Sequence, residues 1–95
     1  MDLLSIVSSL ESNGFNRSVE HLQSFAGFEE KDTCVWSKTG AVSVTVDGVT
    51  VADVWKVCLC ESLEGVWYLV LLRNIRGKVV HSLFGVAGIS SLSFG

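Results

Sequence analysis

The sequence lacks proline, low-complexity tracts and long apolar runs, and each absence excludes a class of protein. Without a proline-rich or repetitive stretch there is no candidate linker, so residues 1–95 are expected to form a single compact α+β domain. The longest apolar run covers only residues 66–72, whereas a helix that spans a membrane needs about 20 such residues. We therefore expect a buried strand there and no membrane partner.

Charged residues are scarce. They make up 18% of the chain, compared with about 25% in an average globular domain, while apolar residues reach 48%. A small domain has little interior in which to hide such an apolar excess, which favours a surface that binds a partner. The formal net charge of −3 argues against a general nucleic-acid binder, because such proteins usually carry a basic face.

Cysteines are few, and their number is odd: Cys34, Cys58 and Cys60. An odd number is a poor basis for a disulfide framework. Cys58 and Cys60 lie two residues apart, so in a strand they point to the same face. We expect three reduced, mostly buried thiols, as in proteins of the cytoplasm. The N-terminus lacks the basic segment that opens a signal peptide, which supports the same cytoplasmic location.

A catalytic or metal-binding set is also missing. The candidate metal ligands are His21, Cys34, Cys58, Cys60 and His81. Their closest pair falls within a predicted strand, whereas structural zinc sites usually place paired ligands on a turn. A nucleophilic Cys58 or Cys60 beside His81 is an alternative, but thiols among valines and leucines are poorly reactive. No glycine-rich phosphate loop is present. We expect no enzyme activity, no metal and no cofactor.

The N-terminal third has helical spacing. Leucines, isoleucine and valine between residues 3 and 10 form an apolar stripe, Asp2 is a capping residue, and Gly14 follows as a helix stop. A second, shorter helix is predicted over residues 18–26, because Val19, Leu22 and Phe25 recur at three-residue intervals. The polar stretch 27–33 predicts a loop.

From Cys34 onward the pattern changes to period two. Asp47-Gly48 between alternating valines is a strong signal for a two-residue β-hairpin turn. The pairs predicted from this turn are Val46–Val49, Val44–Val51 and Val42–Asp53. Asp53 is then the one polar residue on an apolar face. Either it lies near the end of the sheet and reaches water, or it is a buried carboxylate with a functional partner.

Two further turns extend the hairpin into a meander. Residues 62–65 predict a four-residue turn, which makes 66–73 a central strand with both faces apolar. The predicted cross-strand pairs are Leu59–Tyr68, Val57–Val70 and Trp55–Leu72. Residues 74–77 predict the next turn and 78–84 the next strand, and 85–95 forms an edge strand or a loose tail. The predicted fold is α+β, with one or two N-terminal helices packed on a four- to five-stranded antiparallel β-meander.

The first candidate site is a sheet face. In the predicted register Trp67, Leu69 and Leu71 share one face, opposite the face of Val44 and Val70. Two helices cover one face of a five-stranded sheet and hardly both, so we expect the Trp67 face to be the less buried one and to bind a partner. The alternative is that the second helix or the tail folds over it.

The second candidate site is a basic turn. Arg73, Arg76 and Lys78 cluster around residues 74–77. Such a cluster can contact a phosphate or an acidic protein surface. The alternative is that these residues are the ordinary charges of an exposed turn.

The sequence therefore predicts a non-catalytic protein-binding module that acts through a sheet face or edge. Its partner is another protein or a second copy of itself, as in a homodimer. A small inhibitor of a larger host complex, of the kind phages and viruses make, is a special case. The alternative function is a small nucleic-acid-associated protein that uses Arg73, Arg76 and Lys78, with binding that weakens steeply as salt rises.

Overall fold

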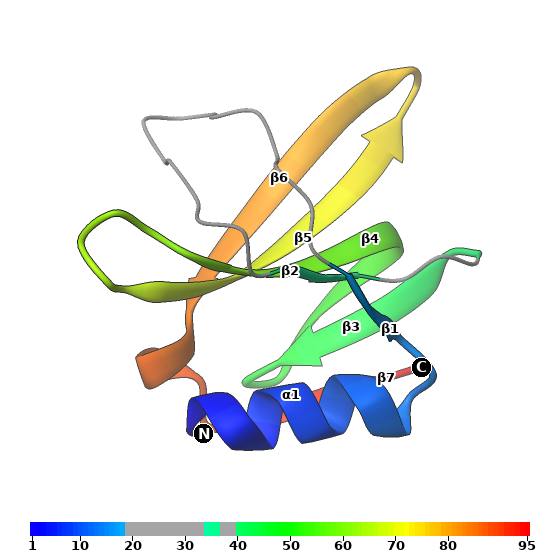
Figure 1. Cartoon of the computed structure of the whole chain (residues 1–95). Helices are drawn as coiled ribbons and strands as arrows, with labels where there is room; N and C mark the ends of the chain where they lie inside the picture. The colour runs from blue at the N-terminus through cyan, green and yellow to red at the C-terminus, as the bar shows by residue number, and fades with distance from the viewer. Residues whose placement is uncertain (19–33, 37–39) are drawn as a thin grey trace.

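The fold is one helix packed on a five-stranded antiparallel sheet, with a small two-stranded sheet beside it (Figure 1). The computed structural model describes residues 1–18, 34–36 and 40–95. Its elements are α1 (Leu3–Ser12), β1 (Asn16–Ser18), β2 (Cys34–Trp36), β3 (Val42–Val46), β4 (Val49–Glu61), β5 (Trp67–Ile75), β6 (Lys78–Gly85), the 3-10 turn η1 (Val86–Gly88) and β7 (Leu92–Phe94).

The predicted fold class is confirmed. The large sheet has the order β6-β5-β4-β3-β7, so β3 to β6 form a meander, and η1 carries the chain from β6 at one edge to β7 at the other. The tail therefore does contain a strand, which pairs with β3. The predicted second helix and the predicted loop 27–33 lie outside the described residues, apart from Ser18, which belongs to β1.

Helix α1 begins and ends as its sequence predicts. The Asp2 carboxylate accepts a hydrogen bond of 2.8 Å from the Ser5 amide. Hydrogen bonding to the Ser5 side chain, and then to its amide, holds the pKa of Asp2 below its usual value. Gly14 has a φ of 83° and directs the chain away from the helix. Ile6 and Leu10 are buried against the sheet.

The β3–β4 hairpin has the predicted turn but only part of the predicted pairing. Asp47 and Gly48 both have positive φ, as a type I′ turn requires, and the pairs Val46–Val49 and Val44–Val51 are confirmed. The pair Val42–Asp53 is wrong, because Val42 lies opposite Val54. Asp53 has a φ of 57° and is exposed at this bulge. This agrees with the interpretation that its carboxylate reaches water and is not buried.

The predicted β4–β5 register is also wrong, by one residue, from Lys56 to Glu61; beyond a bulge, Val54 lies opposite Arg73, as in the predicted register. The structure pairs Leu59 with Leu69 and Val57 with Leu71. The reason is the turn, which has three residues at its centre rather than four: the Ser62 amide donates to the Val66 carbonyl at 2.8 Å. Since side chains alternate along a strand, a slip of one residue exchanges the two faces of β5.

Two apolar clusters cover the two faces of the sheet. The first packs α1 against the sheet and contains Leu69 and Leu71, with Trp67 at its margin. The second lies on the opposite face and contains Val70 and Leu72. The other buried members of the second cluster are Cys34, Cys58 and Cys60. The face of Trp67 is thus the one that α1 covers, contrary to the prediction.

Candidate protein-binding edge

The predicted binding face is interior. Leu69 and Leu71 are fully buried, and Trp67 is half-buried against the α1 cluster. The prediction that the Trp67 face is less buried than the face of Val70 is wrong, because Val70 is equally buried. The physical reason is the one-residue register slip, which turns Leu69 and Leu71 inward to α1. In this conformation neither leucine offers a surface to a partner.

The basic turn is a tight hairpin turn between β5 and β6. Arg76 and Gly77 form a two-residue turn with φ values of 53° and 81°, and the Asn74 side chain accepts a hydrogen bond of 3.0 Å from the Gly77 amide. Arg76 and Lys78 are exposed, and Arg73 is half-buried at the end of β5. We call this group of three cations at the end of the β5–β6 hairpin the basic tip.

An exposed apolar pair lies next to the basic tip and was missed in the sequence. Val79 is 49% exposed and Leu83 is 39% exposed. They lie on one face of β6, opposite Asn74 and Val70 of β5. The sequence signal for this pair was that apolar residues in 78–84 occur at both odd and even positions, and so on both faces of the strand. An edge strand cannot bury both of its faces without a further layer.

β6 forms one edge of the sheet. Among the described residues it pairs with β5 alone, and Figure 1 shows it along the outer side of β5. The pairing is continuous from Tyr68–Gly85 to Ile75–Lys78, so no bulge interrupts it, and the chain has no proline to blunt the edge. Strand edges are usually protected by such devices. β7, at the other edge, has only three residues, and a short edge strand offers little backbone for another strand to pair with.

The outer side of β6 carries the backbone groups that do not pair with β5. Arg76 and Gly77 occupy the centre of a two-residue turn, which closes on a hydrogen-bonded pair, Ile75–Lys78. In an antiparallel ladder, hydrogen-bonded and non-hydrogen-bonded pairs alternate. Three residues therefore direct their amide and carbonyl groups away from β5: Val79, His81 and Leu83. Their side chains all lie on the same face.

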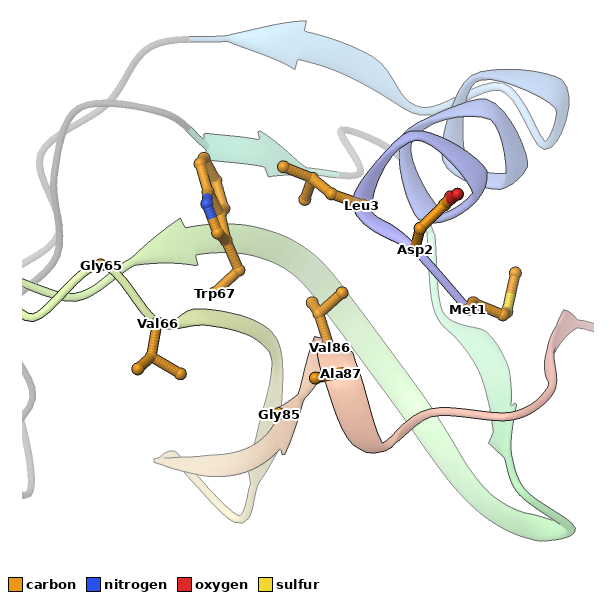
Figure 2. A pocket seen from close by; sticks show the side chains of 9 residues that line it. All are labelled: Met1, Asp2, Leu3, Gly65, Val66, Trp67, Gly85, Val86 and Ala87. Carbon is orange, nitrogen blue, oxygen red and sulfur yellow. The ribbon is translucent and has the colours of Figure 1, made fainter.

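An apolar pocket of about 570 Å³ lies where β6 ends. Leu3 at the start of α1, Trp67 at the start of β5 and Val86 in η1 form walls of this pocket (Figure 2). Asp2 also borders this pocket, and its carboxylate caps α1 through the Ser5 amide. The terminal ammonium group of Met1 donates a hydrogen bond to the Ile89 carbonyl, which ties the chain start to the segment after η1.

The thiols lie together inside the second cluster. The sulfur atoms of Cys34 and Cys60 are 3.5 Å apart, and Cys58 is buried nearby on the same face. Lys56 lies 4.7 Å from the ring centre of Trp36 and 4.9 Å from that of Trp55, so cation–π contacts tie β2 to β4. This arrangement fills the space between β2 and the sheet.

The alternative Cys–His site is not assembled in the described part of the chain. Strand β5 separates Cys58 and Cys60 in β4 from His81 in β6, and His21 lies outside the described residues. Within residues 1–18, 34–36 and 40–95, no group of three or more His, Cys, Asp or Glu side chains is placed to hold a metal ion. In the same residues no helix has the length and apolar character needed to cross a membrane.

Comparisons with known proteins add no relative: no protein-family model, no curated protein sequence and no solved structure matches this chain.

Proposed function

We propose that this chain is a non-catalytic protein-binding module that binds its partner along the outer edge of β6. The observation that carries the proposal is the pair Val79 and Leu83, exposed on an eight-residue edge strand. A partner strand that adds to this edge would gain main-chain hydrogen bonds and cover both side chains. Affinity would come from the backbone, and specificity from the apolar pair and the basic tip.

Two features of the surroundings support this proposal. The sheet beneath β6 is rigidly packed, because its neighbour β5 is buried on both faces at Leu69, Val70 and Leu71, and a rigid edge loses little entropy when it binds. The reduced thiols accord with a cytoplasmic protein. Inhibition of a larger host complex is one way in which such a module would act, by occupying a strand site on its target.

The nucleic-acid alternative has weaker support. The basic tip contributes only two exposed cations, Arg76 and Lys78, in a chain of net charge −3. Phosphate contacts would also leave Val79 and Leu83 uncovered. If this alternative holds, an oligonucleotide will bind at low salt and will be released steeply as salt rises.

The test is a pull-down from the native host with a matched pair of variants. Val79→Lys puts a charge on the β6 edge, whereas Val49→Lys makes the same change at a valine that is 60% exposed at the start of β4. We expect the wild type and Val49→Lys to retain the same partners, and Val79→Lys to lose them. If Val79→Lys retains every partner of the wild type, binding does not occur along β6.

A further inference from the structure

We propose that the apolar pocket where β6 ends binds a small, uncharged aromatic molecule. Its volume of about 570 Å³ lies within the range of about 300–1,000 Å³ that small-molecule sites occupy. Three segments far apart in the sequence build the pocket, namely residues 1–3, 65–67 and 85–87. The described residues that line it do not include Val79 or Leu83, so this site is separate from the exposed pair on the β6 edge.

The walls of the pocket are apolar and already in place. Val86 is 5% exposed and belongs to the first cluster, while Leu3 and Trp67 are half-buried and pack against that cluster. Figure 2 shows the Leu3 side chain pointing from α1 toward Trp67, with Val86 in the same pocket. A ligand that enters such a pocket exchanges water for apolar contacts, and little of the protein has to reorganise to receive it.

The walls favour a flat ring. Trp67 contributes its indole to the pocket, and aromatic pairs gain from offset-stacked and edge-to-face contacts beyond the area that they bury. Gly65 and Gly85 add stretches of wall without a side chain, and a Cβ at either position would meet no atom within 4 Å. Gly85 has a φ of −65°, which any residue adopts, so the backbone itself does not require a glycine there. Bare backbone of this kind lets a flat ligand approach closely.

The lining of the pocket disfavours a charged ligand. Among the described residues that line it, only Asp2 has a charged side chain. Its carboxylate would repel an anion; it is also exposed and already accepts the Ser5 amide, so a cation beside it would remain in water. The terminal ammonium group of Met1 donates to the Ile89 carbonyl. A charged group inside the pocket would therefore lose its water without gaining a counter-ion, which is costly.

The first test compares two dyes that share one ring system. N-phenylnaphthylamine is uncharged, whereas anilinonaphthalene sulfonate carries a sulfonate on the same rings, and both become more fluorescent in apolar surroundings. Titrated into the purified full chain, the uncharged dye should saturate at one molecule per chain. It should bind at least about tenfold more tightly than the sulfonate, which must give up water without a cation to pair with. Lack of saturable binding of the uncharged dye overturns the inference, and equal binding of the two dyes overturns the uncharged class.

The second test locates the dye with variants whose folding is checked by circular dichroism. Trp67→Ala removes the aromatic wall and should weaken binding of the uncharged dye at least about tenfold. Ala87→Lys puts a cation at an exposed position of the wall and should shift the affinity ratio of the two dyes about tenfold toward the sulfonate. Ala52→Lys makes the same change at an exposed alanine of β4 outside the lining and should leave the ratio unchanged.

These variants decide the location of the site even if one of them does not fold. A folded Trp67→Ala that binds the uncharged dye as the wild type does overturns the inference. If Trp67→Ala fails to fold, Ala87→Lys decides alone. An affinity ratio that Ala87→Lys changes no more than Ala52→Lys does means that the dyes bind elsewhere, which also overturns the inference.

Methyl NMR of the full chain gives an independent map and separates this inference from the proposed function. The uncharged dye should shift the methyl resonances of Leu3 and Val86, which line the pocket, and leave those of Val49 and Val79 in place. Shifts confined to methyl groups outside the lining overturn the inference. Val79→Lys should bind the dye as the wild type does, since Val79 lies near the other end of β6, opposite Asn74. If the wild type does not bind the uncharged dye while Val79→Lys loses its host partners, the pocket proposal is wrong and the β6 edge proposal stands.

Discussion

Truncation of Leu71 tests the packing of the sheet against α1. Leu71 is fully buried between the sheet and α1. Leu71→Ala removes three carbon groups, which lose about 2.4 kcal/mol of transfer free energy at about 0.8 kcal/mol each. The cavity that remains adds to this, so the free energy of unfolding should fall by about 3–4 kcal/mol, within the range of buried leucine truncations.

The measurement is chemical denaturation followed by tryptophan fluorescence, with thermal melting as a second readout. A loss of about 3 kcal/mol lowers the melting temperature of a chain of this size by roughly 12–24 °C. Leu63→Ala is the matched control, because Leu63 is 66% exposed and its truncation should change stability by less than about 0.5 kcal/mol. If Leu71→Ala costs less than about 1 kcal/mol, Leu71 is not buried in the core beneath α1.

Three further predictions follow from local geometry. Gly77→Ala should lower stability by about 1–2 kcal/mol because φ is 81° there, whereas Gly85→Ala, with open space and ordinary φ, should be nearly neutral in the same thermal melts. Asp2→Ala should lower the melting temperature at neutral pH but not in acid: the depressed pKa of Asp2 means that its contribution is present above the ordinary value of about 4 and is lost as pH falls through the lower folded-state pKa. Cys34, Cys58 and Cys60 are buried, so an alkylating thiol reagent should label them slowly in the folded chain and rapidly in denaturant; mass spectrometry measures the labelling, and rapid labelling of the folded chain would show that the second cluster does not bury them.

Local signals predicted local structure well. The Asp2 cap, the Gly14 stop and the Asp47-Gly48 turn each depend on a few neighbouring residues, and all three are as expected. Such features are set by backbone preferences that a short sequence window contains. The fold class followed from the same signals, because a helix followed by alternating strands has few ways to bury its apolar surfaces.

Register could not be predicted from alternation. The bulge at Asp53 and the short turn after Ser62 each shift pairing by one residue, and neither changes the apolar pattern of the strands concerned. Strand β5 is apolar on both faces, so its sequence fits either register equally well. The prediction that Leu69 and Leu71 bind a partner depended on the predicted register. In the observed register both leucines face α1, so the prediction has no support.

The edge of β6 was missed for a related reason. Its apolar residues were visible in the sequence, but their exposure depends on β6 lying at the edge, which is set by the path of the chain through η1 to β7. That path joins residues far apart in sequence. Only Arg73, Arg76 and Lys78 were located correctly as a group, because they belong to one hairpin.

The carboxylate of Asp47 has a consequence for the order in which the sheet forms. It accepts hydrogen bonds from the Ser90 and Ser91 amides, at 2.8 and 2.7 Å, so the turn of the β3–β4 hairpin holds the segment that leads into β7. That hairpin closes over a few residues and can form early, whereas β7 must return from more than forty residues away. We expect β7 to dock last in folding and to open first in hydrogen exchange. The sheet would then lose its short edge before its long one, and β6 would stay intact in the partly opened chain.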